Sequence, residues 1–301
     1  MPSAAPRQAD ENERKFFSGI AVDPSPRIRL ENGSREFTMR AMDLVCPIGM
    51  GQRGLIVAPP GSGKTTFLKH ICRAVAQSCP EMKLYCLLID ERPEEVTDIR
   101  RNVTAEVHAS SSDQTYDNHL RTADELMKKV FAQAAEGADV MVVIDSLTRL
   151  ARVHNAGSAS SGRTLSGGVD ARALEVPRRI FGAARKIENG GSLSIMATIL
   201  VDTGSRMDQV IFEEFKGTGN MEIVLSRDLA NHRIFPAIDI AASNTRKKEL
   251  LLSPEELDFS DKLRRLLLER DPLESGRELV EMLGKYPSNS ELLAALKLKN
   301  Q

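Results

Sequence analysis

Residues 54–66 read G-L-I-V-A-P-P-G-S-G-K-T-T, an apolar run that passes through a glycine-rich turn into a helix-forming segment. This order is typical of a phosphate-binding loop, where backbone N–H groups and a helix N-terminus hold phosphate oxygens. In this pattern Lys64 supplies a positive charge, and the Thr65 hydroxyl is placed to bind magnesium. Ala58 replaces the usual first glycine, which keeps the residue small but reduces backbone freedom. The alternative is a chance glycine-rich turn, which predicts no nucleotide.

Apolar runs and helical patterns alternate on both sides of this loop. The expected buried strands are residues 54–57, 84–89, 140–144 and 193–198, and the expected helices are residues 65–78, 113–135 and 171–187. This alternation predicts an α/β fold with a mostly parallel sheet flanked by helices.

The two ends of the chain differ in composition from the middle. Residues 1–26 are rich in Ala, Pro, Ser and charge, which predicts a flexible N-terminal arm. Beyond residue 252 the pattern is purely helical, with a break at Asp271-Pro272, which predicts a small C-terminal helical cap over residues 253–301. The main domain is therefore expected over residues 27–252.

Composition excludes several classes of protein. With 301 residues, 41% of them hydrophobic, and a net charge of -1, the chain reads as an ordinary globular protein. Any hold on a polyanion must therefore come from local basic residues. The four cysteines lack metal-binding spacing and are expected to be buried thiols. No run approaches the roughly 18 apolar residues of a membrane span, and no secretion signal is recognisable, so we expect no membrane contact and a cytoplasmic location.

Two further apolar runs end in acids. Residues 138–145 end in Asp145, which is expected to support magnesium, and residues 84–89 lead into Glu91, a candidate general base for polarising a water. Strand ends of an open α/β sheet line its ligand crevice, so both acids are expected near the loop. The alternatives are a helix cap for Asp145 and a solvated first helical turn for Glu91.

Two loops and three arginines remain outside this periodicity. The loops at 157–168 and 202–208 are small and polar, with an isolated Arg in each, which suits a nucleic-acid backbone, although a mobile connector without a ligand fits equally. Arg227, Arg233 and Arg246 are candidates for an arginine finger acting on a neighbouring subunit, or are ordinary surface ion pairs.

Several longer stretches extend this evidence. They are P-I-G-M-G-Q-R-G at 47–54, L-L-I-D-E-R-P-E-E-V at 87–96, D-S-L-T-R-L-A-R at 145–152, G-G-V-D-A at 167–171, F-G-A-A-R at 181–185, D-T-G-S-R-M-D at 202–208 and E-E-F-K-G-T-G-N-M-E at 213–222. Together with the loop at 54–66, they make the chain resemble the bacterial transcription termination factor Rho family over most of its length.

The resemblance implies a RecA-like P-loop ATPase that assembles as a hexameric ring, uses ATP and Mg²⁺, and moves RNA through a central pore to end transcription. RNA polymerase or a full-length Rho are the further partners that it implies. The positions that match the family's ATP contacts are Gly49, Met50, Gly51, Gln52, Arg53, Gly54, Gly61, Ser62, Gly63, Lys64, Thr65, Thr66, Arg92 and Phe235.

Individual roles also follow from the resemblance. It implies that Glu91 and Lys64 serve catalysis, that Arg246 is the finger offered to the next subunit, and that Thr65 and Asp145 hold the metal. Arg92 matches an arginine that senses the nucleotide, and Phe235 an aromatic that packs on adenine. The positions that match RNA contacts are Arg163, Thr164, Gly204, Ser205, Arg206 and Lys216.

The chain departs from the family in two ways. Family members commonly have Lys at the position of Gly61, so one phosphate-facing charge is absent. The preceding RNA-loading OB-fold, about a hundred residues or more in the family, is not matched, and a short arm stands in its place. Two alternatives to an RNA translocase therefore remain: a ring ATPase with another cargo, and a Rho-like subunit that modulates a full-length ring.

Overall fold

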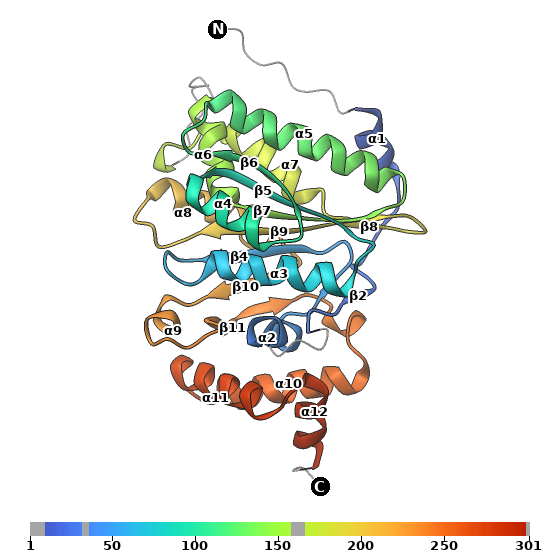
Figure 1. Ribbon diagram of the computed structural model, residues 1–301, viewed down its shortest axis with the longest axis vertical. Coiled ribbons are helices and arrows are strands. Elements are labelled where there is room, and N and C mark those ends of the chain that lie inside the picture. The colour runs from blue at the N-terminus through green and yellow to red at the C-terminus, as the bar shows by residue number, and fades with distance from the viewer. Residues whose placement is uncertain (1–9, 32–35, 158–165, 299–301) are drawn as a thin grey trace.

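The computed structural model describes residues 10–31, 36–157 and 166–298 of the chain. Its centre is a sheet, and seven strands form its main path. They are β4 (Arg53–Ala58), β5 (Lys83–Glu91), β6 (Glu106–Ser111), β7 (Asp139–Asp145), β9 (Ser192–Leu200), β10 (Met221–Leu225) and β11 (Ile238–Thr245). Their hydrogen-bonded order is β11-β10-β4-β9-β7-β5-β6, and in Figure 1 they follow one another from the lower to the upper half of the molecule.

All neighbours on this path are parallel except β10 and β11, which are antiparallel. The short strand β8 (Arg185–Ile187) pairs antiparallel with both β9 and β1 (Ala21–Val22), while β2 (Arg27–Ile28) pairs with β3 (Ile48–Gly49). The central strands β7 and β9 are buried almost throughout, because helices cover both faces of a parallel sheet. The predicted fold class is confirmed.

The helices divide between the two faces of the sheet. One apolar cluster gathers residues of α2 (Phe37–Val45), α3 (Lys64–Ser78), α4 (Pro93–Asn102), α10 (Pro254–Leu268), α11 (Pro272–Lys285) and α12 (Asn289–Leu298). The other gathers residues of α1 (Glu11–Ser18), α5 (Tyr116–Ala135), α6 (Leu147–Gly157), α7 (Glu175–Gly182) and α8 (Arg206–Phe215). Ile56 of β4 packs in the first cluster and Leu55 in the second, because successive side chains of a strand point to opposite faces of the sheet.

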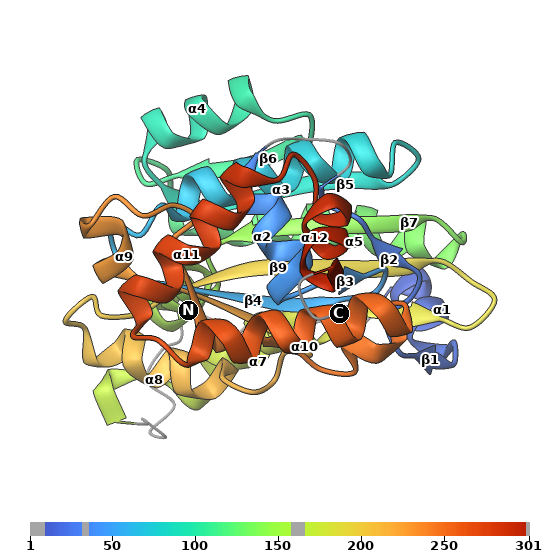
Figure 2. The same ribbon diagram turned by 90° about the horizontal axis from the view of Figure 1, so that it is seen from below.

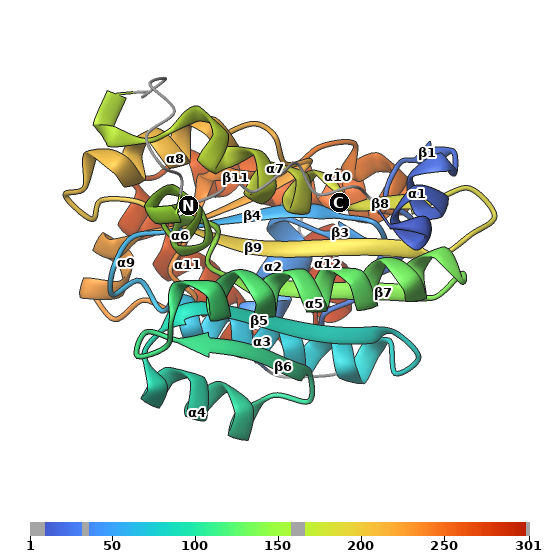
Figure 3. The same cartoon turned by 90° about the horizontal axis from the view of Figure 1, so that it is seen from above.

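Two views along the long axis show this division. From below, α10, α11 and α12 lie across the end of the molecule nearest β11 (Figure 2). From above, α5 runs along β5 and β7 (Figure 3). A small third cluster joins α9 (Arg227–Asn231) to α11. In the described part of the chain, no helix combines the length and apolar character needed to cross a bilayer.

The helix predicted over residues 171–187 is wrong in its second half. Residues 171–174 form a 3₁₀ turn, α7 ends at Gly182, and the chain then turns into β8. The reason is tertiary pairing, since Arg185 lies opposite Leu193 of β9. The helix predicted from residue 113 starts at Tyr116 because Ser111 and Gln114 close a turn ahead of it.

The flexible arm predicted over residues 1–26 is wrong for residues 10–26. Helix α1 begins at the cap residue Asp10 and packs on α5. The ring of Phe16 is only 2% exposed, and its centroid lies 6.0 Å from that of Phe131. Phe17 lies 5.6 Å from the same ring and carries the Arg185 guanidinium 4.2 Å above it. Burial of two aromatic rings therefore orders a segment whose composition is otherwise charged.

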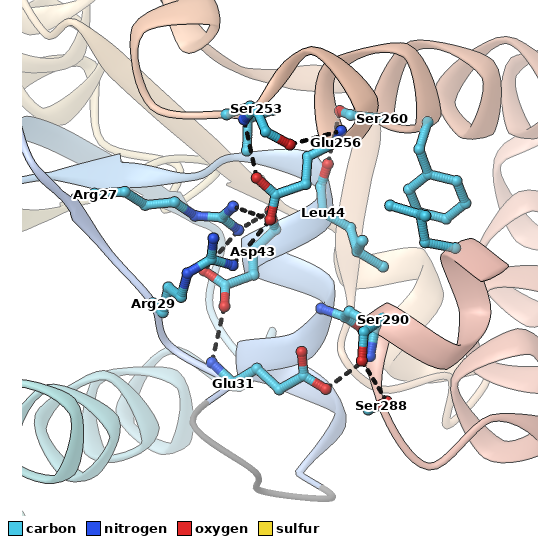
Figure 4. A pocket seen from close by; sticks show the side chains of 14 residues that line it. Arg27, Arg29, Glu31, Asp43, Leu44, Ser253, Glu256, Ser260, Ser288 and Ser290 are labelled. Atoms are coloured by element: carbon cyan, nitrogen blue, oxygen red, sulfur yellow. Dashed lines mark hydrogen bonds and ion pairs between the residues drawn. The ribbon is translucent and has the colours of Figure 1, made fainter.

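A polar network ties the chain that follows this helix to the C-terminal helices (Figure 4). Arg27 and Arg29 both donate to Glu256 on α10, at 3.1 and 2.9 Å. Asp43 on α2 accepts the N–H of Glu31 at 2.8 Å, and burial raises the pKa of Asp43 to about 6. These groups line a cavity of about 600 Å³. The helical cap thus packs on the body of the sheet domain, and the boundary at residue 252 stays a prediction.

Candidate active site

The phosphate-binding loop and the strand-end acids meet at one edge of the sheet. Ala58, where the loop begins, lies opposite Leu200 at the end of β9, and Leu88 of β5 lies opposite Asp145 at the end of β7. Because these strands are parallel, their carboxyl ends share this edge. The sheet therefore brings the loop, Glu91 and Asp145 together.

The loop backbone is shaped to receive an anion. Gly61 and Gly63 have φ values of +78° and +91°, which glycine adopts without strain. Gly63 caps α3 without a side-chain hydrogen bond, so the first N–H groups of the helix have no side-chain acceptor. Ser62 is buried and donates to the carbonyl of Pro59 at 2.8 Å, which holds the turn in place.

Lys64 lies between the two acids. Its Nζ is 2.5 and 2.6 Å from the oxygens of Asp145 and 3.4 Å from Oε2 of Glu91. Asp145 is fully buried, and Glu91 is 1% exposed. Thr198 Oγ1 also donates to Asp145, at 2.8 Å. One ammonium group therefore balances two buried carboxylates, and an anion that attracted it would leave both carboxylates without this partner.

Glu91 has a second cation, which sequence reasoning missed. Arg149, at the start of α6, donates to Glu91 Oε1 at 2.8 Å and also to the carbonyl of Asp90. Burial raises the pKa of Glu91, and the charges of Lys64 and Arg149 only partly offset that effect. No spacing in the sequence marks this contact, because Arg149 lies on α6 and Glu91 at the end of β5.

Helix α6 continues from this site to the predicted RNA loops. Arg152 pairs with Asp208 of α8, with Nε 2.8 Å from Oδ1. Asn155 donates to the carbonyl of Gly168 at 3.1 Å and accepts the N–H of Asp170 at 2.7 Å. Helix α6 thus contacts both the segment at Gly168, through Asn155, and helix α8, through Arg152.

The described parts of those loops lie side by side. A Cβ at Gly167 would be 2.9 Å from the carbonyl oxygen of Arg206, so the two backbones touch. Gly204 has a φ of +76°, Ser205 caps α8, and the Arg206 side chain is exposed. Lys216 lies at the other end of α8 and is also exposed. The predicted RNA contacts Arg163 and Thr164 lie outside the described residues.

Strand β11 separates Phe235 from Arg246. Ile238 lies opposite Leu225 at the carboxyl end of β10, which puts Phe235 at the edge of the phosphate-binding loop. Phe235 is 44% exposed, and its ring is 3.7 Å from a Cβ built on Gly63. These two residues, together with Thr66, line a pocket of about 510 Å³. Arg92 is exposed and lies 3.5 Å from Glu95.

Arg246 follows the far end of β11. Thr245 pairs with Met221, which in turn pairs with Gly54 at the start of β4. The strand has eight residues, so Arg246 lies roughly 25 Å from the edge of its own phosphate-binding loop. Its Nη2 donates to the carbonyl of Gly217 at 2.9 Å.

The segment that precedes β4 and is predicted to contact ATP also lies at the sheet edge opposite the phosphate-binding loop. It consists of Gly49, Met50, Gly51, Gln52, Arg53 and Gly54, which enter the start of β4, whereas the phosphate-binding loop follows its end. A nucleotide in the loop of the same protomer would not reach this segment, and its contact with ATP stays a prediction. Arg53 lies near Arg246, and burial together with the Arg246 charge lowers the pKa of Arg53. Within the described residues, no carboxylate lies within 4.0 Å of either guanidinium.

Oxygen donors suited to a magnesium ion are present at the loop edge. Asp145 and the Thr65 hydroxyl flank Lys64, and Thr65 Oγ1 lies 3.4 Å from Glu95. Magnesium is commonly held by only one or two protein oxygens together with substrate phosphates. The described residues include no group of three or more His, Cys, Asp or Glu that could hold a metal without such a substrate.

Comparison with known proteins identifies relatives of this chain. Residues 38–245 match the family model "ATP synthase alpha/beta family, nucleotide-binding domain". The transcription termination factor Rho of Micrococcus luteus is 52% identical over 93% of this chain and 40% of its own length. The Rho proteins of Karelsulcia muelleri and Haemophilus influenzae are 48% and 50% identical, with 76% and 68% of their lengths covered. The chain thus spans about 40% of the Micrococcus relative and more of the other two.

Solved structures agree on the fold. An ATPase from the type III secretion system of pathogenic bacteria superposes with a TM-score of 0.70 at 25% identity, covering 83% of this chain and 71% of that one. The assembled ATPase EscN of enteropathogenic E. coli gives a TM-score of 0.69 at 21% identity, covering 89% and 68%, and shows the fold alone.

Proposed function

The chain belongs to the transcription termination factor Rho family, within the wider ATP synthase alpha/beta nucleotide-binding family, and we propose that it is an RNA-dependent ATPase that moves RNA through a ring of its own copies. The substrate is ATP, and its hydrolysis drives RNA movement in transcription termination in the cytoplasm. The observation that carries this proposal is the convergence of Lys64, Glu91 and Asp145 on the phosphate-binding loop.

The ion pairs of the site suggest how ATP binds. The triphosphate enters the loop, where the N–H groups of Gly63 and the first turn of α3 bind its oxygens. Lys64 exchanges Asp145 for phosphate oxygens, and Asp145 and the Thr65 hydroxyl would then hold the magnesium ion. Bound magnesium supplies charge neutralisation on the phosphates.

Glu91 then has the role of holding and polarising the attacking water. Its burial favours a carboxylate that takes up a proton more readily than an exposed one, as a general base requires. Arg149 orients it through Oε1, which leaves Oε2 to face the water once Lys64 has moved.

The second half of the site comes from a neighbouring protomer. Arg246 and Arg53 lie at the sheet edge opposite their own phosphate-binding loop, and both lack a carboxylate partner among the described residues. The guanidinium of Arg53 is half-buried and that of Arg246 is exposed, and they repel each other, which favours an added anion that the phosphates on an adjacent subunit would supply. This contact requires a head-to-tail ring.

RNA binds in the pore at the neighbouring loops that contain Gly167 and Arg206. Their support comes from α6, whose Arg149 contacts Glu91 and whose Arg152 contacts Asp208. A change in the charge balance at Glu91 is therefore passed along one helix to the residues beside Arg206.

The test measures ATP turnover by the purified chain with and without an unstructured polyribonucleotide. We expect stimulation by RNA, and loss of turnover to background in Glu91→Gln and Lys64→Ala. Glu94→Gln is the matched control, because Glu94 is an exposed acid three residues away on α4. Turnover that ignores RNA would remove the translocase function and favour another cargo, and full activity of Glu91→Gln would remove the proposed site.

A further inference from the structure

The pocket beside the phosphate-binding loop has a polar wall as well as an aromatic one. Phe235 and Pro236 line this pocket of about 510 Å³ together with Gly61 and Gly63 of the loop. The wall farther along α3 and α2 is made of His70, Thr38 and Glu36. His70 stands one helical turn beyond Thr66, so it lies deeper than the groups that face the phosphates.

The partners of His70 determine which ring nitrogen carries its proton. Nδ1 lies 3.1 Å from Oε1 of Glu36 and 3.1 Å from the hydroxyl of Thr38. Glu36 caps α2 and accepts the N–H groups of Thr38 and Met39, at 2.7 and 2.9 Å. Burial acts to raise the pKa of Glu36, but the hydrogen bonds from His70, Thr38 and Met39 lower it to about 2.

An ionised carboxylate accepts hydrogen bonds and donates none, so Nδ1 of His70 must be the donor. In the neutral imidazole the other nitrogen, Nε2, then presents a lone pair. All the contacts of His70 given by the structure run through Nδ1 within the described part of the chain. With a neutral ring, Nε2 is therefore an acceptor on a side chain that lines the nucleotide pocket.

We propose that His70 reads the base of the bound nucleotide, with Nε2 accepting a hydrogen bond from the exocyclic amino group of adenine. This inference rests on the proposed function, because it assumes that the pocket holds a nucleoside triphosphate with its phosphates in the loop. Guanine carries a carbonyl oxygen at the corresponding position, which would face the lone pair of Nε2 and leave both acceptors unsatisfied.

The other groups of the wall discriminate less between bases. The Phe235 ring offers a stacking surface that every base can use. The Thr38 hydroxyl both donates and accepts, so it adapts to an amino group or a carbonyl. Glu36 fixes the His70 tautomer and is therefore a positioning residue.

The experiment measures the dissociation constants of Mg-ATP and Mg-GTP for the whole purified chain by calorimetry at neutral pH. A net hydrogen bond of about 0.5–1.5 kcal/mol corresponds to roughly a 2- to 13-fold preference for ATP in the wild type. His70→Ala is expected to bring the ratio of the two constants close to one. His70→Phe, which keeps a ring on the wall but has no acceptor, is expected to do the same.

Three further variants separate base reading from general effects. Glu36→Gln can donate to Nδ1, which permits the other tautomer, so the ratio should move toward GTP. Phe235→Ala should weaken both nucleotides equally. Arg73→Ala, an exposed position on the same helix, should change neither constant.

Equal affinity of the wild type for ATP and GTP would overturn the proposal, and so would a wild-type ratio that persists in both His70→Ala and His70→Phe. Either result leaves the ATPase function standing. If the wild type binds neither nucleotide, the proposed function fails, and this inference fails with it.

Discussion

Replacing Arg246 with Ala should abolish ATP turnover by a uniform population of this chain. Arg246 and the phosphate-binding loop lie at opposite ends of β11, a strand of eight residues that spans roughly 25 Å, which no single side chain can bridge. The guanidinium can therefore act only on a nucleotide held by another copy. Arginine fingers supplied in trans contribute about 10³–10⁵ in rate, which is the expected loss.

The assay that tests this reasoning mixes two inactive variants. Arg246→Ala retains an intact phosphate-binding loop, and Lys64→Ala retains an intact Arg246. In a one-to-one mixed ring, about one quarter of the interfaces join a good loop to a good arginine, so turnover should recover to roughly that fraction of wild type. Mixing Arg246→Ala with the double variant Lys64→Ala/Arg246→Ala is the matched control, and it should recover nothing.

Absence of recovery in rings shown by native mass spectrometry to contain both subunits would refute the trans assignment. Recovery in the control mixture would also refute it, because that mixture contains no intact Arg246.

Arg206→Ala should reduce RNA stimulation of turnover while the dissociation constant of ATP stays unchanged; equal loss of both would make Arg206 structural. Burial raises the pKa of Glu91, and Glu91 must be ionised to act as general base, so kcat should fall on acidification with a midpoint above pH 4.5. A pH-rate profile with a lower midpoint would contradict the role of Glu91 as general base. The pKa of Asp43 is about 6 in the folded protein and 3.8 ordinarily, so the stability that protonated Asp43 contributes, about 3 kcal/mol, is lost as pH rises through that range. In Asp43→Asn, the free energy of unfolding measured in urea should therefore change less between about pH 4 and 6 than in the wild type. An unchanged pH dependence in the variant would contradict the raised pKa of Asp43. Phe16→Ala should lower the free energy of unfolding by about 3–5 kcal/mol, whereas a change below 1 kcal/mol would mean that α1 is not held on α5.

Chain order made the loop edge of the site predictable. Parallel strands have their carboxyl ends at one edge of the sheet, and Lys64, Glu91 and Asp145 each follow an apolar run, so the sequence alone places them together. The far edge was not predictable in this way. Arg246 follows an antiparallel strand that sequence periodicity did not reveal, because β11 alternates buried and exposed residues irregularly.

Other errors have the same origin in tertiary contacts. Composition predicted a flexible arm, but burial of Phe16 against Phe131 orders α1, and no local pattern announces a partner more than a hundred residues away. Pairing with β9 likewise turns Arg185 out of a helical pattern. Arg149 could not be identified from sequence because it lies on α6, whereas its partner Glu91 ends strand β5.

Helix α6 is a stiff rod of eleven residues that is attached near both ends. At one end Arg149 donates to the carboxylate of Glu91, the proposed general base, and at the other Asn155 donates to the carbonyl of Gly168. Because backbone hydrogen bonds hold successive turns of α6 together, the helix cannot tilt at one end alone. Under the proposed function, water activation at Glu91 and RNA binding beside Gly168 therefore depend on one rigid element. A mutation that makes α6 more flexible should leave ATP hydrolysis and RNA binding present but weaken the dependence of one on the other.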